Sequence, residues 1–374
     1  MDLNLIPTLD PNPLPAPYWV FKILLLVTFS LHVVAMNLLV GGAALALIAR
    51  KTSNEYGARI FADLSKKLPS FLPATITIGI APLLFLQVIY GPYFYTSTII
   101  MGWLWFSVLV LLTISYYGFY FASFKSTEIP EHAARVMLVS FLIVLGVGFL
   151  HSNVATLAQS PARWATKYFA DPTGWNLNLT DPTLIPRYLH FFVAAIAVGG
   201  LLLAFVGIAN WQRDSAYGRA ILTLGGKAFL LATMAQYLIG AWFLIALPRE
   251  QRSFFMGENK FASAFLTLGF VCGLAAIFIM FIALRQHDPR RPIYTATGFT
   301  AVVVLAMIVA RDLLRDSYLK PYLQTQHFVV KTQWTVFPLF VALFTAGVVL
   351  WFLMLKRYFF PSADNTPSAA QSRI

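Results

Sequence analysis

The stretch LHVVAMNLLVGG at residues 31–42 lies inside an apolar run long enough to cross a membrane. Such a run needs about 20 residues, because a helix rises about 1.5 Å per residue and the hydrocarbon core is about 30 Å thick. Outward from this stretch, eight further runs of this kind follow along the chain. The sequence therefore predicts an all-α integral membrane protein. We expect nine transmembrane helices at 19–48, 72–96, 99–123, 134–158, 186–210, 220–247, 262–284, 293–314 and 334–357.

The composition supports this class and excludes several others. Of the 374 residues, 59% are hydrophobic and only 11% are charged, whereas soluble domains carry about 25% charged residues. The formal net charge of +12 does not indicate nucleic-acid binding, because the Lys and Arg residues fall mostly between the apolar runs. Cys272 is the single cysteine, which excludes disulfide frameworks, Cys-ligated zinc, iron–sulfur clusters and covalently attached c-type haem.

The positive charges also predict the orientation of the chain. Alternate connections divide the 27 Lys and Arg residues unequally, with 16 on the side that includes the first loop. Cytoplasmic loops carry the excess, so we expect the N-terminus outside and the C-terminus in the cytoplasm of a cell inner membrane. Residues 1–19 lack the features of a cleavable signal, and the polar tail at 361–374 is expected to be disordered.

The opening stretch recurs later in the chain as LHFFVAAIAVGG at residues 189–200, so both copies read LHxxxxxxxVGG. The Gly pairs are expected to let neighbouring helices approach closely. Four predicted spans separate the copies, an even number, which indicates a parallel repeat of two four-helix bundles plus a ninth helix. The expected parts are 1–180, 181–330, the ninth helix at 331–360 and the tail at 361–374.

Histidines within the spans are the first functional candidates, because an ionisable side chain in the bilayer is costly. His32, His151 and His190 lie in spans, and His327 lies in an outer loop. Imidazole is an axial ligand of b-type haem, and helix bundles commonly present such ligands in their cores. The alternative is that each histidine only hydrogen-bonds a neighbouring helix. Zinc is disfavoured, because the adjacent spans offer no carboxylate or thiolate ligand.

Two arginines near the outer end of the eighth span are further candidates. Arg311 and Arg315 share one face of the predicted helix, and Asp312 is placed to pair with Arg315. Arginines of this kind bind haem propionates through bidentate, charge-assisted hydrogen bonds. The alternative is an ordinary solvated helix end.

Three segments carry a resemblance to a known family. They are FSLH at 29–32 with the later Gly41, IPRYLH at 185–190, and residues 138–161. These segments resemble subunit I of the cytochrome bd-type quinol oxidases, and the likeness extends over all nine spans. The resemblance implies that His32 occupies the family's first-helix haem site and that His190 occupies its low-spin haem b site.

The chain also departs from that family. Residues 102–120 lack the glutamates of the family's third helix, and Thr267 stands near its methionine ligand. Arg311 or Asp312 stands near its eighth-helix glutamate, and the long quinol-binding loop is reduced to residues 249–260. Because these features serve oxygen chemistry in the family, we expect this chain not to reduce oxygen itself.

The available histidines lead to a hypothesis of two non-covalent, bis-histidine haems b. In this hypothesis His32 pairs with His151, and His190 pairs with His327. Two alternatives stay open: one haem that bridges His32 and His190, or one haem at His190 only.

The sequence therefore predicts a b-type cytochrome subunit that carries electrons between the quinone pool and an outer-face c-type cytochrome partner. It would act within a larger respiratory complex, with quinone near Arg249, Arg252 and Lys260 or between helices near a haem edge. The competing hypotheses are a cofactor-free membrane scaffold derived from an oxidase subunit and, suggested only by the repeat, a transporter.

Overall fold

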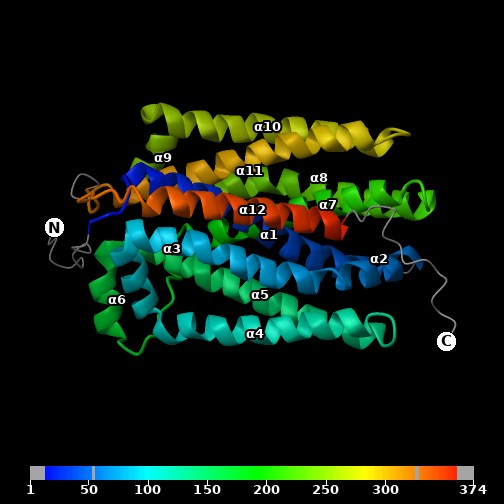
Figure 1. The fold of residues 1–374 in the computed structure, drawn as a ribbon, viewed down its shortest axis with the longest axis horizontal. Helices are drawn as coiled ribbons and strands as arrows, with labels where there is room; N and C mark the ends of the chain where they lie inside the picture. The colour runs from blue at the N-terminus through cyan, green and yellow to red at the C-terminus, as the bar shows by residue number, and fades with distance from the viewer. Residues whose placement is uncertain (1–12, 53–54, 325–327, 360–374) are drawn as a thin grey trace. The chain divides into compact units, whose positions relative to one another are not determined.

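The computed structural model describes residues 13–52, 55–324 and 328–359. Within these ranges nine helices are long and apolar enough to cross a membrane, and the only β pairing is an isolated bridge between Leu14 and Val330. The expected all-α membrane fold is confirmed (Figure 1). The nine helices are α1 (Tyr18–Lys51), α3 (Leu68–Ile100), α4 (Gly102–Lys125), α5 (Pro130–Ala158), α7 (Leu184–Asn210), α8 (Ser215–Ala246), α10 (Lys260–Arg285), α11 (Arg290–Leu319) and α12 (Val336–Phe359).

Short helices between the spans were not expected from the sequence. They are too short and too polar to stand out as apolar runs, although α2 buries Ile60, Phe61 and Leu64 along one face. A π-helical turn at Phe254–Glu258 precedes α10 and contains Gly257 at φ +130°, a backbone conformation that favours glycine. The short α-helices are α2 (Glu55–Ser65), α6 (Trp164–Ala170) and α9 (Arg249–Ser253).

By its contacts the described chain forms a large compact unit, which includes Lys22–Gln324, and a small unit that includes residues 13–21 and 328–359. The large unit contains most of both predicted halves, and their division into two four-helix bundles at 1–180 and 181–330 stays a prediction. The tail at 361–374 lies outside the described residues.

The repeated Gly pairs bring helices of the large unit into close contact. A Cβ built on Gly41 of α1 would lie 1.9 Å from the carbonyl oxygen of Ala195 in α7. A Cβ on Gly199 of α7 would in turn lie 2.7 Å from the Cα of Gly41. Corresponding glycines of the two repeat copies therefore meet where α1 crosses α7. On another face of α7, a Cβ on Gly200 would lie 2.5 Å from the carbonyl oxygen of Gly225 in α8.

Consecutive helices pack as antiparallel neighbours, namely α4 with α5, α7 with α8 and α10 with α11 (Figure 1). Helix α7 also contacts α5 and α11, so it lies between elements of both predicted halves. The fold also brings the candidate side chains of α1, α5 and α11 toward one another, whereas His190 of α7 faces α8.

Candidate functional site

His32 of α1 is held by helix α3. Its Nδ1 lies 3.0 Å from the carbonyl oxygen of Thr75, and because a carbonyl only accepts, Nδ1 donates the hydrogen bond. That bond fixes the tautomer in which Nε2 carries the free lone pair, the usual state of a metal-binding histidine. The ring packs on Gly79, where an added Cβ would lie 2.7 Å from Cε1. This geometry leaves Nε2 of His32 without a hydrogen bond to the described chain.

His151 of α5 belongs to the same cluster. It lies close enough to His32 and Arg311 for their charges to interact, and its ring centroid is 6.3 Å from that of Trp105 in α4. Its side chain is exposed and forms no hydrogen bond within the described ranges of the chain. Both ring nitrogens are therefore without a protein partner there, so either could take part in binding a ligand.

Arg311 of α11 completes the cluster. Its guanidinium lies over two aromatic rings, with Cζ 4.4 Å from the ring centroid of Phe29 and 6.0 Å from that of Phe191. Among the residues that the structure describes, no carboxylate pairs with it. An unpaired cation in an apolar setting is costly, so Arg311 is a candidate for binding an anion.

His190 of α7 lies against helix α8. Its ring faces Gly240, where an added Cβ would lie 3.7 Å from Cε1, and its main-chain carbonyl accepts a 2.6 Å hydrogen bond from Gln236. Its Nδ1 is buried with no hydrogen-bond partner in the described part of the chain. Gly79 and Gly240 are 161 residues apart, close to the spacing of the histidines that they contact, so the repeat extends to the packing of both rings.

The remaining histidines lie elsewhere. His132 and His287 are exposed, as expected for surface residues. His327 lies outside the described residues, so its pairing with His190 stays a prediction.

Arg315 differs from Arg311 in being paired within the chain. It forms the expected ion pair with Asp312, and its Cζ lies 4.1 Å from the ring centroid of Tyr90. Lys22 is 2.5 Å from Asp312 and 2.8 Å from Asp316, and the Tyr90 hydroxyl donates to Asp316 at 2.5 Å. Tyr90 reaches this ion-pair cluster from a kink in α3, where its ψ of 26° is not helical.

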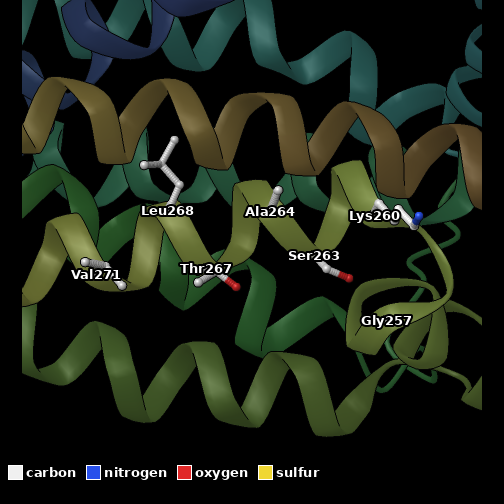
Figure 2. Close-up of a pocket in the computed structure, with 7 residues that line it drawn as sticks. All are labelled: Gly257, Lys260, Ser263, Ala264, Thr267, Leu268 and Val271. Carbon is white, nitrogen blue, oxygen red and sulfur yellow. The ribbon is translucent and has the colours of Figure 1, made fainter.

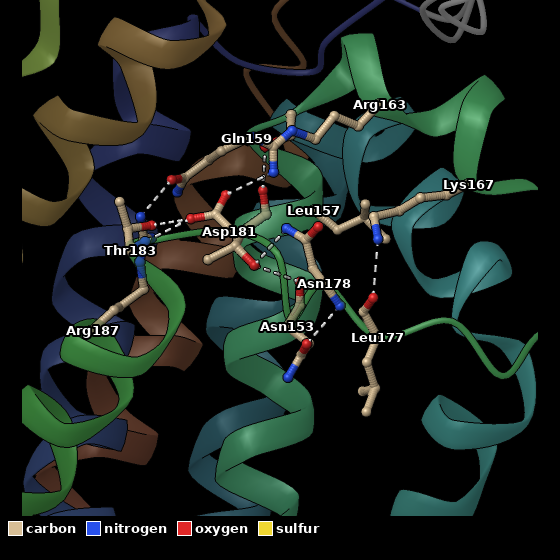
Figure 3. Close-up of polar contacts among 12 residues, drawn as sticks. Asn153, Leu157, Gln159, Arg163, Lys167, Leu177, Asn178, Asp181, Thr183 and Arg187 are labelled. Carbon is tan, nitrogen blue, oxygen red and sulfur yellow. Dashed lines mark hydrogen bonds and ion pairs between the residues drawn. The ribbon is translucent and has the colours of Figure 1, made fainter. Parts of the chain in front are cut away.

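A second buried arginine, Arg187, was not among the sequence candidates. It is 4% exposed, and its terminal NH₂ donates a 2.9 Å hydrogen bond to the side-chain oxygen of Gln159 (Figure 3). Its Nε is buried without a hydrogen-bond partner among the described residues. The only sequence signal was its place in the segment IPRYLH, one helical turn before His190.

The available donors suit a haem. Within the described ranges, no group of three or more His, Cys, Asp or Glu side chains is placed to hold a metal ion. A haem needs only axial ligands from the protein, because the porphyrin supplies four nitrogens itself. The nitrogen of His32 that is free to coordinate, the unbonded His151 and the unpaired Arg311 fit these requirements.

Near the predicted quinone region, helix α10 borders an open groove of about 660 Å³ (Figure 2). Lys260, Ser263 and Thr267 supply its polar atoms, and Leu268 and Val271 supply much of its apolar surface. Of the three basic residues expected near quinone, only Lys260 lines this groove. Thr267, which the sequence comparison placed near the family's methionine ligand, lines the groove as well.

No protein-family model matches the sequence, and no curated protein matches it. The structure is similar to a chain in the solved structure of bd oxidase from Geobacillus thermodenitrificans, with a TM-score of 0.68 and 11% sequence identity. The match covers 92% of this chain and 98% of that one. At this identity the likeness shows a shared fold. The expected bd-oxidase-like architecture is confirmed, and the assignment to subunit I stays a prediction.

Proposed function

We propose that the chain is a b-type cytochrome subunit of a respiratory complex in the cell inner membrane. It carries electrons between the quinone pool and an outer-face partner such as a c-type cytochrome. The observation that supports this proposal is the convergence of His32, His151 and Arg311 from helices that are distant in sequence. The first haem is held by His32 and His151, and a second is held by His190 with His327.

Each residue of the cluster has a distinct role in this proposal. The Thr75 carbonyl orients His32 through Nδ1, which increases the basicity of the opposite nitrogen. Arg311, held over Phe29 and Phe191, binds a propionate and compensates its charge in the apolar interior. When bound, a haem held by two histidines would supply one-electron transfer rather than oxygen chemistry.

The test is a pyridine haemochrome assay with a reduced-minus-oxidised spectrum on the purified full chain and on single alanine variants. We expect about two haems b per chain in the wild type, since each of the two histidine pairs supplies both axial ligands. His32→Ala and His151→Ala should lose the same haem, so the double variant should lose no more than either single one. His190→Ala should lose the other haem.

Matched controls are His132→Ala and His287→Ala, which remove exposed histidines and should leave the spectrum unchanged. Absence of a Soret band from protein purified under conditions that preserve cofactors would contradict the proposal and favour the cofactor-free scaffold. Loss of different haems from His32→Ala and His151→Ala would reject their pairing.

A further inference from the structure

Arg187, near the beginning of α7, is a buried cation whose hydrogen-bond partner among the described residues is neutral. With 4% of its surface exposed, its guanidinium has left water, yet Gln159 supplies only a neutral oxygen and Nε has no partner in the described part of the chain. A buried cation normally requires a hydrogen-bonded anion, because its lost hydration must be replaced.

The positive charge of Arg311 increases the free-energy cost of burying Arg187. The charge of Arg311 is repelled by that of Arg315 and, more weakly, by that of Arg187. Each cation raises the cost of burying the other, so a single anion between α7 and α11 would relieve both.

The nearby carboxylates of the chain already have partners. Asp312 is paired with Lys22 and Arg315. Asp181, the carboxylate whose charge acts on Arg187, accepts hydrogen bonds of 2.9 and 2.6 Å from the main chain and hydroxyl of Thr183 (Figure 3). Arg187 and Arg311 have only neutral partners among the described residues, so an anion that pairs with them would come from outside the described chain.

We propose that Arg187 and Arg311 together bind the carboxylates of the tetrapyrrole. This inference rests on the proposed function, since it requires haem to bind near His32, His151 or His190. The sequence analysis had paired Arg311 with Arg315 for this role. Arg187 replaces Arg315 here, because Arg315 forms an ion pair with Asp312 whereas Arg187 and Arg311 form none with an aspartate among the described residues. A guanidinium suits this task because its N–H groups match the two oxygens of a carboxylate.

The experiment compares haem b with haem b dimethyl ester, which keeps the iron and the ring but lacks carboxylates. The full chain, produced without haem in lipid nanodiscs, is titrated with each and followed by its Soret band. Because charge-assisted hydrogen bonds are lost with the ester, the wild type should bind haem b at least about tenfold more tightly. Arg187→Gln and Arg311→Gln should each reduce that preference, and Arg187→Lys should restore part of it.

The control is Arg163→Gln, because Arg163 is 45% exposed in its side chain and lies 3.8 Å from Asp181. This variant should keep the wild-type preference. Equal affinity of the wild type for haem b and for its ester would overturn the proposed carboxylate site. An unchanged preference for haem b in Arg187→Gln would overturn it as well. Absence of binding by either compound would instead overturn the proposed function and this inference with it.

Discussion

At the scale of single residues, the imidazole of His32 depends on a glycine in another helix. The ring occupies the position that a side chain at Gly79 would need, whereas His190 leaves an ordinary contact distance of 3.7 Å to a Cβ on Gly240. Two histidines in repeated sequence contexts therefore differ in how tightly they are held. The tighter one is the ring that also has a hydrogen bond from Nδ1 to the Thr75 carbonyl.

This difference predicts the effects of two alanine substitutions. Gly79→Ala would place a methyl group 2.8 Å from Nδ1 of His32, so the ring must move and its bond to Thr75 must break. We expect loss of about one haem per chain, since an axial ligand is displaced, and a destabilisation of about 1–3 kcal/mol from overpacking. Haem content and thermal unfolding in detergent measure the two effects.

Gly240→Ala and Gly146→Ala serve as controls. A Cβ on Gly240 meets its nearest atom at 3.7 Å, and one on Gly146 in α5 meets nothing within 4 Å. Both variants should retain the wild-type haem content. Unaltered spectra in Gly79→Ala would show that the position of the His32 ring does not matter for cofactor binding.

At the scale of helices, α1 and α7 cross where Gly41 meets Gly199. A Cβ on either residue would collide with main-chain atoms of the other helix, which cannot rotate aside as a side chain can. The contact thus sets the separation of the helices that carry His32 and His190. Small residues favour such close crossings because association of helices in lipid depends on packing.

We expect Gly41→Ala to force α1 and α7 apart, because its Cβ would lie 1.9 Å from the Ala195 oxygen. The cost should be at least about 1–3 kcal/mol, the usual range for inserted methyl groups. Unfolding with a denaturing detergent gives the free-energy difference. Gly298→Ala in α11 is the matched control, since a Cβ there meets nothing within 4 Å, and equal stability of the two variants would reject the close-packing role.

At the scale of the whole molecule, the orientation in the membrane decides on which side the proposed haem sites lie. The uneven distribution of Lys and Arg predicts that the connection between α5 and α7 is outside and that the connection between α10 and α11 is cytoplasmic. Arg187 lies near the beginning of α7, close to the first of these connections, so the proposed carboxylate site would lie toward the outer face.

Cysteine labelling tests this orientation, because Cys272, the single native cysteine, is buried. Thr180→Cys and Asp288→Cys place new thiols at exposed positions of the two connections. A membrane-impermeant maleimide added to intact spheroplasts should label Thr180→Cys only, and lysis should make Asp288→Cys reactive. The reverse pattern would invert the predicted topology and move the site to the cytoplasmic side.

The sequence by itself determined the number and approximate limits of the spans, because the length of an apolar run is a local property. It also determined the repeat and the candidates His32, His151, His190 and Arg311. The short helix α2 was missed, because its 11 residues are too few and too polar overall to stand out as an apolar run, although its apolar residues follow helical spacing.

Only the tertiary structure decided which of these side chains meet. Helix rotation and crossing placed His32 over Gly79, brought His151 and Arg311 to it, and gave Arg315 but not Arg311 an aspartate partner. The same packing left Arg187 buried without an anion. These contacts depend on distances between helices far apart in sequence, and no local pattern of residues encodes them.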